Sequence, residues 1–293
     1  MKVKLLIVSL MITIGLLTGC ASSSNSIVVG AKDYTEQYVL GNLLAIFIEE
    51  NTNIDVTFTS DMASDIIFAA INAGAVDVYI DYTGTIYGSY MIRSDRGSPE
   101  EIFNIVSTTL KESHDIFMFD PLGFNNSFGI AVRRDTAAEY DLKTISDLAT
   151  ISANFIFGGS YDILVRNDGL PNLKVLYDMG FQEERILYGI NRYIALENDE
   201  IQVTEVFTTD GSLLTYDLVV LDDDMNFFPP YQGAIVIRGE TLEENPQLQG
   251  LLEKLSGVLT NDIMRQLNYM VDEQGLDPRD VAEKFLRDNN LIG

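Results

Sequence analysis

The sequence has few of the residues that enzymes most often use for metal binding and redox chemistry. Among 293 residues there is one Cys, one His and no Trp. A single Cys excludes an internal disulfide and a Cys-rich metal site, and a single His removes the usual imidazole ligands of zinc. The absence of Trp excludes a binding site built from Trp rings. We therefore expect no metal, no cofactor and no catalytic residue.

Basic residues are also scarce. Lys and Arg together number 19 against 44 for Asp and Glu, which gives a formal net charge of −25. Such a charge repels phosphate backbones, so we expect no nucleic-acid partner. The hydrophobic share of 46% and the charged share of 22% are ordinary for a globular protein and exclude disorder as the main state. The length suits one large or two medium domains.

The apolar run near the N-terminus, from Leu5 to Leu17, is shorter than the roughly 20 residues that span a bilayer. Two lysines precede it, as in the signal peptide of an exported protein. The run ends in Leu17-Thr18-Gly19-Cys20, which resembles the lipobox of bacterial lipoproteins. The resemblance implies a signal peptide over 1–19, lipid attached to Cys20, and an extracytoplasmic protein anchored to the cell membrane. The alternative is an ordinary buried Cys behind a plain signal peptide.

The polar segment 20–26 suits a flexible tether, and regular periodicity begins at Ile27. Strand patterns at 27–29, 54–58 and 76–80 alternate with helical patterns at 35–50 and 64–73. A further helix begins at Ser98-Pro99 and carries a capping-box Glu at position 101. This alternation predicts α/β layers with a largely parallel sheet.

A second series of strand patterns is too long to fit into the same small sheet. Further strands are predicted at 128–132, 154–157, 185–190, 205–208, 218–221 and 234–237, and the last helix begins at Asp277-Pro278. We therefore predict two α/β lobes. Residues 27–130 and 229–293 form lobe 1, residues 131–228 form lobe 2, and the chain crosses near Ile130 and Phe228.

Several segments of the sequence resemble one known family. Residues 30–37 (GAKDYTEQ) look like the opening of the substrate-binding proteins of osmoprotectant ABC transporters, which bind glycine betaine, carnitine and choline. Further segments follow in the family's order: 77–85 (DVYIDYTGT), 120–128 (DPLGFNNSF), 192–196 (RYIAL), 209–211 (TDG), 216–221 (YDLVVL) and 227–231 (FFPPY). The resemblance covers nearly all of 27–293. It implies a type II-like periplasmic-binding-protein fold with a hinge between the lobes, a permease partner and no enzymatic activity.

The resemblance also implies a particular ligand chemistry. A trimethylammonium group has no N–H to donate and spreads its charge over methyl groups, so aromatic faces recognise it well. The positions that match the family's aromatic cage are Tyr82, Phe128, Tyr193 and Tyr216. The family usually has Tyr where this chain has Phe128, and a phenyl ring attracts cations more weakly. With the predicted crossings, Tyr82 and Phe128 belong to lobe 1, and the other two rings belong to lobe 2.

Gln37, Thr85 and Asn126 lie in the same motifs and are able to donate hydrogen bonds to the other end of the ligand. No Arg falls in the three segments that contain these residues, 30–37, 77–85 and 120–128, so they do not separate betaine, carnitine and choline. Gln37 has an alternative as a first-turn helix residue, and Asn126 has one as a turn residue.

Two other functional classes fit parts of the pattern. A binding protein of the same fold for an amino acid or a polyamine is the nearer one, although the aromatic cage positions argue against it. A lipid-anchored hydrolase is supported by no motif. The acids 222–224 favour a solvated loop over a calcium site, Asp210 is suited to a turn or to ligand contact, and His114 is expected at a helix end on the surface.

Overall fold

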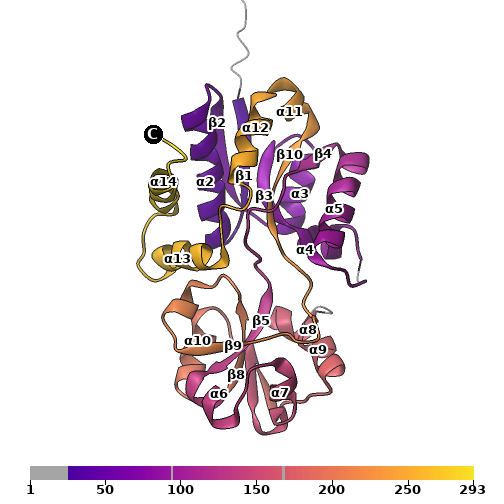
Figure 1. Cartoon of the computed structure of the whole chain (residues 1–293), viewed down its shortest axis with the longest axis vertical. Coiled ribbons are helices and arrows are strands. Elements are labelled where there is room, and N and C mark those ends of the chain that lie inside the picture. Colours follow the sequence, from indigo (N-terminus) through magenta and orange to yellow (C-terminus); the bar gives the residue numbers. More distant parts are fainter. Residues whose placement is uncertain (1–25, 94, 167–168) are drawn as a thin grey trace, which may run out of the picture.

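The computed structural model describes residues 26–93, 95–166 and 169–293. Two lobes lie one above the other in Figure 1, and two segments of chain run between them. Each lobe contains one five-stranded sheet with helices on its faces. The predicted α/β fold with two lobes is confirmed. The predicted signal peptide, Cys20 and all of the tether except Ser26 lie outside the described residues.

Lobe 1 contains the sheet β2-β1-β3-β10-β4. Its strands are β1 (Ser26–Lys32), β2 (Asp55–Met62), β3 (Val78–Tyr82), β4 (Ile116–Met118) and β10 (Gly233–Arg238). The helices that precede the crossing are α2 (Thr35–Asn51), α3 (Ser64–Asn72), α4 (Thr83–Thr85), η1 (Ile86–Tyr90) and α5 (Pro99–His114). Those that follow the return are α11 (Gly239–Glu244), α12 (Gln247–Leu252), η4 (Glu253–Leu255), α13 (Asn261–Asp272) and α14 (Pro278–Asp288).

Lobe 2 contains the sheet β7-β6-β8-β5-β9. Its strands are β5 (Phe128–Arg133), β6 (Ile156–Gly159), β7 (Glu183–Ile186), β8 (Val203–Phe207) and β9 (Leu218–Leu221). Its helices are α6 (Arg134–Tyr140), α7 (Ile145–Ala149), η2 (Ser152–Asn154), α8 (Tyr161–Val165), α9 (Leu170–Tyr177), α10 (Ile190–Glu197) and η3 (Gly211–Leu214). Strand β7 ends earlier than predicted, because α10 starts at Ile190, directly after Gly189, which has a positive φ.

Both sheets are largely parallel, as predicted: in each sheet four of the five strands run in the same direction and one runs against them. Strand β1 pairs parallel with β2 and β3, and β6 pairs parallel with β7 and β8. Strand β10 is antiparallel to β3 and β4, and β5 is antiparallel to β8 and β9. The antiparallel strands β5 and β10 are those that the chain enters on arriving from the other lobe. They therefore run away from the junction, whereas β3 and β8 run toward it.

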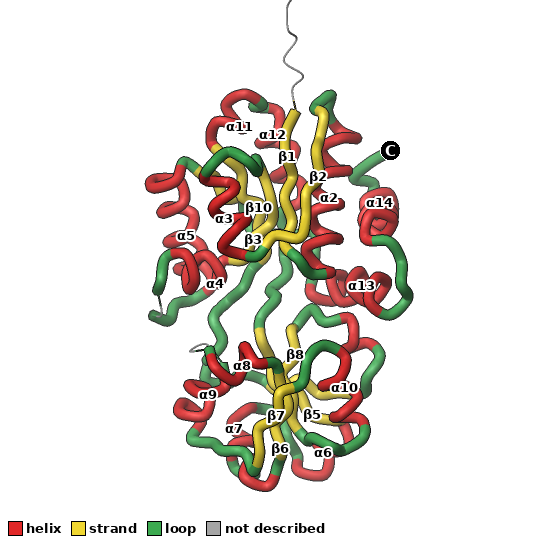
Figure 2. The backbone as a smooth tube through the Cα atoms, turned by 180° about the vertical axis from the view of Figure 1, so that it is seen from behind, coloured by secondary structure: helices red, strands yellow, loops and turns green. Residues whose placement is uncertain are grey.

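The chain crosses between the lobes in two segments, 119–127 after β4 and 222–232 after β9. Figure 2 shows both as loops between the two bodies. The boundary that we predicted after residue 130 falls inside β5, because the whole of this strand belongs to the sheet of lobe 2. The two segments are hydrogen-bonded to each other, with the Asn126 N–H donating to the Tyr231 carbonyl at 3.0 Å. We call 119–127 the first connecting segment and 222–232 the second.

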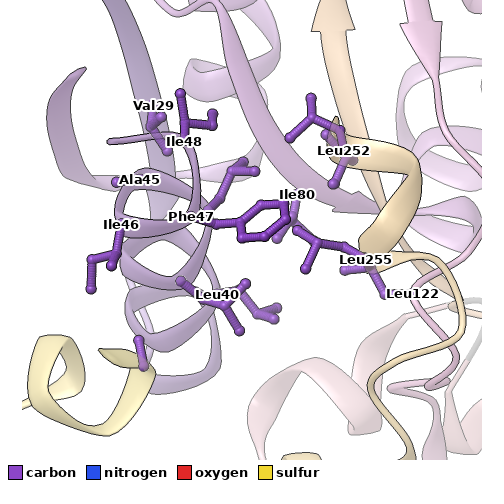
Figure 3. Packing of buried hydrophobic residues seen from close by; sticks show 14 of the residues in the cluster. Val29, Leu40, Ala45, Ile46, Phe47, Ile48, Ile80, Leu122, Leu252 and Leu255 are labelled. Atoms are coloured by element: carbon purple, nitrogen blue, oxygen red, sulfur yellow. The ribbon is translucent and has the colours of Figure 1, made fainter. Parts of the chain in front are cut away.

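Helix α2 forms the centre of the lobe 1 core. All residues from Val39 to Ile48 are buried, because the sheet covers one side of the helix and α12, α13 and α14 pack on others. Figure 3 shows Phe47 of this helix directed toward Leu252, Leu255 and Ile80. The sequence predicted a stripe of apolar residues on one side of this helix. The structure buries the helix on more sides than that, because the C-terminal helices also pack against it.

The predicted helix start at Ser98 is confirmed. The Ser98 side chain accepts from the Glu101 N–H, and the Glu101 carboxylate accepts from the Ser98 N–H. This capping box starts α5 with Pro99 at its first position. Within residues 26–93, 95–166 and 169–293, no helix combines the length and the apolar character needed to cross a membrane.

Candidate ligand-binding site

Strands of both sheets end at the junction of the lobes. After β3, the Thr83 N–H donates to the Gln232 carbonyl of the second connecting segment at 3.1 Å. After β8, the Thr208 hydroxyl donates to the Asn125 carbonyl of the first connecting segment at 2.6 Å. The carboxyl ends of strands from both sheets therefore meet at the hinge, which is where ligands bind in open α/β sheets.

On the side of lobe 1, three of the predicted residues meet around Glu36, which the sequence reasoning did not single out. The Tyr82 hydroxyl donates to Glu36 Oε1 at 2.6 Å, and Asn126 Nδ2 donates to the same oxygen at 2.8 Å. Gln37 Nε2 donates to the Tyr82 hydroxyl oxygen at 3.1 Å and to the Ile80 carbonyl at 3.0 Å. Gln37 thus positions the ring and the strand in this structure. Thr85, half-buried at the end of α4, is not one of the residues that bond Glu36.

A buried ion pair lies behind Tyr82. Lys32 Nζ is 2.5 Å from Asp81 Oδ1, and the two side chains are 2% and 0% exposed. Asp81 also accepts from the Tyr79 hydroxyl at 2.7 Å and from the Tyr82 N–H at 2.8 Å. The carboxylate therefore holds the end of β3 in place and neutralises the lysine.

In lobe 2, Tyr193 of α10 and Tyr216 stack on each other, with ring centroids 5.4 Å apart and planes 21° apart. The Tyr193 hydroxyl donates to Asp210 Oδ2 at 2.5 Å. Arg192 Nη2 donates to the same oxygen at 2.9 Å, and so does the Phe207 N–H, also at 2.9 Å. Asp210 therefore orients the aromatic pair from the turn after β8. Burial, followed by the charge of Asp210, raises the pKa of Tyr193, so its hydroxyl stays protonated.

Phe128 is the first residue of β5 and belongs to lobe 2, which corrects the predicted split of two rings on each lobe. Its ring lies 4.8 Å from that of Phe207 and 6.1 Å from that of Phe228. The two neighbouring rings cover much of the Phe128 side chain, and the residue is 8% exposed. Tyr82 is thus the one predicted cage ring on lobe 1, and the other three are on lobe 2.

Three of the four predicted cage rings already lie near a cation of the protein itself. Lys32 Nζ is 5.2 Å from the centre of the Tyr82 ring, and Arg166 Cζ is 5.7 Å from that of Phe128. Arg192 Cζ is 4.9 Å from the centre of the Tyr193 ring. These are cation–π distances, so the surroundings of the rings already accommodate positive charge. A ligand cation must use another face of each ring or displace the side chain.

A cleft of about 2060 Å³ separates the lobes on the side of η1 and of helices α8 and α9. Residues 226–232 of the second connecting segment form one of its walls. Of the seven residues predicted to bind ligand, Phe128 is among those that line it. Tyr82, Tyr193 and Tyr216 are not, so this cleft does not gather the four rings around one space.

Three further tyrosines that the sequence reasoning missed follow strands that run toward the junction. Tyr34, Tyr161 and Tyr188 follow the ends of β1, β6 and β7 by two residues each, and they are 38%, 53% and 59% exposed. The signal available in the sequence was an aromatic residue near the end of a predicted strand: Tyr34 and Tyr161 come five and four residues after the strands predicted at 27–29 and 154–157, and Tyr188 lies within the strand predicted at 185–190. Asn268 of α13, which donates to Glu36 Oε2 at 3.1 Å, carried no such signal.

The acids at 222–224 organise the second connecting segment. Asp223 accepts from the Tyr177 hydroxyl at 2.5 Å and from the N–H groups of Phe227 and Phe228 at 2.9 and 2.8 Å. Asp224 accepts from the Ser146 hydroxyl at 2.6 Å. His114 lies at the exposed end of α5, with Nδ1 2.6 Å from Asn72 Oδ1.

Two named relatives share most of this chain. A carnitine transport binding protein of Listeria monocytogenes is 32% identical over 274 residues, which is 92% of this chain and 89% of that protein. An ergothioneine transport permease/ergothioneine binding protein of Helicobacter pylori is 33% identical over 267 residues, which is 91% of this chain. This chain spans 48% of the Helicobacter protein's length.

A solved structure described as a glycine betaine/carnitine/choline ABC transporter has a TM-score of 0.85 against this chain. It is 30% identical and covers 90% of this chain and 99% of its own. The family model of the substrate binding domain of ABC-type glycine betaine transport systems matches residues 25–288. This match includes both sheets, both connecting segments and all seven residues predicted to bind ligand. This chain belongs to the family of substrate-binding domains of ABC-type glycine betaine transport systems.

Proposed function

We propose that this protein captures a quaternary ammonium osmoprotectant, such as glycine betaine, choline or carnitine, between its lobes and delivers it to the permease of an ABC transporter. The observation that carries the proposal is the match of residues 25–288 to the family of substrate-binding domains of ABC-type glycine betaine transport systems. The predicted cage rings on the two lobes support it, because aromatic faces attract a quaternary ammonium. The family is one of substrate-binding transport proteins and not of enzymes, and such proteins of ABC importers are extracytoplasmic.

The rings alone do not account for useful affinity. At about 0.5 to 2 kcal/mol each, four rings supply roughly 2 to 8 kcal/mol gross, whereas micromolar binding needs about 8 kcal/mol net. Burial of the ligand's methyl groups and hydrogen bonds to its other end must supply the difference. Neutral donors such as Asn126 and Thr85 serve a carboxylate and a hydroxyl alike.

The distribution of the rings gives closure a physical cause. Tyr82 lies on lobe 1, and Phe128, Tyr193 and Tyr216 lie on lobe 2. A cation that touches both groups does so only when the lobes approach, so it binds the closed state more tightly and shifts the population toward it. Closure then signals to the permease that the site is occupied.

Calorimetry with a panel of ligands tests the ligand class. The panel contains glycine betaine, choline, carnitine and ergothioneine, with amino acids and polyamines as competitors. We expect heat of binding from one or more of the quaternary amines, and small-angle scattering should show a smaller radius of gyration at saturation. Heat from an amino acid or a polyamine but from no quaternary amine contradicts the proposal. Binding without compaction leaves the ligand class standing and rejects closure.

We further propose that Cys20 anchors the mature protein to the membrane by lipid. The support is the lipobox-like Leu17-Thr18-Gly19-Cys20 directly after the apolar run. We expect Cys20→Ser to abolish lipid labelling and to leave the protein either released from the membrane or uncleaved. Cell fractionation with metabolic lipid labelling measures both. Unchanged labelling and membrane retention in the variant reject the anchor.

A further inference from the structure

Glu36 lies at the point where four parts of the molecule meet. It is 3% exposed and belongs to the first turn of α2. Its carboxylate accepts from Tyr82 at the end of β3, from Asn126 in the first connecting segment and from Asn268 in α13, at 2.6, 2.8 and 3.1 Å. The Thr209 side chain of lobe 2 is a fourth partner. One buried carboxylate therefore joins a predicted ligand ring, the hinge, a C-terminal helix and the second lobe.

The two asparagines are oriented for a charged partner. Asn126 Oδ1 and Asn268 Oδ1 are buried and have no hydrogen-bond partner among the described residues. Each amide thus directs its NH₂ group toward Glu36 and leaves its oxygen unpaired. An unpaired buried acceptor costs about 1 to 3 kcal/mol, and bonds to an ionised acceptor are roughly twice as strong as neutral ones. The arrangement is therefore suited to an ionised Glu36.

Asn268 also contacts lobe 2. Asn268 Nδ2 donates to the Thr209 carbonyl at 2.9 Å as well as to Glu36. One turn earlier on α13, Arg265 Nε donates to the Thr208 carbonyl at 2.8 Å. Gly211 packs closely on the same helix, since a Cβ placed there meets the Tyr269 nitrogen at 2.6 Å. Helix α13 is thus a third, non-covalent link between the lobes.

From these contacts we infer that Glu36 is a positioning residue for ligand binding. It holds the Tyr82 ring in a fixed position relative to the hinge and to the contact between α13 and lobe 2. The inference rests on the proposed function. When the lobes rotate, the first connecting segment and residues 208–211 are the parts that shift relative to β3. The bonds to Glu36 couple the ring to that rotation.

The charge state of Glu36 makes this role measurable. Burial raises the pKa of Glu36, and its hydrogen bonds partly offset that rise. The other titratable or charged groups around it are Tyr34, Tyr82, the Lys32–Asp81 pair and Asp272, which accepts from the Thr35 hydroxyl on α2. Protonation removes an acceptor from the junction, so ligand affinity should fall as the pH falls through the raised pKa. Stability should change in the opposite direction, because the raised pKa means that the folded state gains stability when Glu36 takes up a proton.

Titrations of wild type and Glu36→Gln with glycine betaine and with choline, from about pH 8 to about pH 5, test the inference. The charge of the quaternary nitrogen does not change over this range. We expect Glu36→Gln to bind about tenfold more weakly at neutral pH, to lose the pH dependence seen in wild type, and to unfold at the same or higher denaturant concentration. Tyr82→Phe, which keeps the ring and removes the donor to Glu36, should also lose the pH dependence.

Asp272→Asn is the matched control, since it neutralises an acid on α13 that bonds Thr35 and not Tyr82. It should keep the wild-type affinity and pH profile. If wild type binds and Glu36→Gln matches it in affinity and pH profile, the positioning role is wrong while the proposed function stands. If Asp272→Asn loses the pH dependence instead, the role belongs to Asp272. If wild type binds neither amine nor any other quaternary amine of the calorimetry panel, the proposed function itself is rejected.

Discussion

Replacing Asp81 with Ala should lower the free energy of unfolding by about 3 to 5 kcal/mol, because the change leaves Lys32 as an unpaired buried charge. The lysine side chain is 2% exposed, so solvent does not reach it to compensate. The substitution also removes the acceptor of the Tyr79 hydroxyl and of the Tyr82 N–H. Denaturant unfolding of the ligand-free protein, followed by circular dichroism, measures the loss.

The control for this prediction is an exposed ion pair of the same lobe. Glu49 and Arg279 are 3.1 Å apart, and their side chains are 35% and 49% exposed. Glu49→Ala should cost less than about 1 kcal/mol, because solvent screens the pair and solvates the remaining charge. A loss for Asp81→Ala no larger than the loss for Glu49→Ala would mean that Lys32 finds another partner or reaches water.

Replacing Tyr193 with Ala should weaken binding of the quaternary amine by about fivefold or more and should also destabilise lobe 2. The ring is 2% exposed and stacks on Tyr216, so its removal leaves a cavity worth about 3 kcal/mol or more. It also leaves the Tyr216 ring without its stacking partner. Calorimetry measures the affinity, and denaturant unfolding measures the stability.

Tyr193→Phe separates the ring from its hydroxyl. It keeps the stacking face and removes the hydrogen bond to Asp210, so we expect a loss of about 1 to 2 kcal/mol in stability. Its affinity should stay within about threefold of wild type, since a phenyl face still attracts a cation. Wild-type affinity in Tyr193→Ala would exclude this ring from the ligand site, whatever the stability measurement shows.

Local patterns in the sequence predicted most of the elements. The capping box at Ser98, the alternation around Val56 and the Pro-initiated helix at Asp277 depend on neighbours a few residues away, and the structure confirms all three. The predicted number of lobes is also confirmed, because the strands were too many for one small sheet. These features depend on residues that are close to one another in the sequence.

Strand direction and lobe assignment depended on contacts that are distant in sequence. The periodicity of residues 128–133 and 233–238 is that of any buried strand, and it does not show which neighbours they pair with. Pairing with β8 and β9 places the whole of β5, including Phe128, in lobe 2. The sequence had predicted that lobe 2 begins only after residue 130. The antiparallel direction of β10 follows from its return through the hinge.

The sequence by itself determined the chemistry of this protein: an acidic chain with a single His and a single Cys, and with aromatic residues in the family's cage motifs. Tertiary structure alone decided which groups those rings touch. Glu36 and Asn268 are 232 residues apart in the chain, and Lys32 and Asp81 are 49 apart. No local pattern marks such pairs, because a buried polar group needs a partner but its own sequence does not specify which one. The packing of α13 against α2 and the return of the chain through the hinge supply those partners.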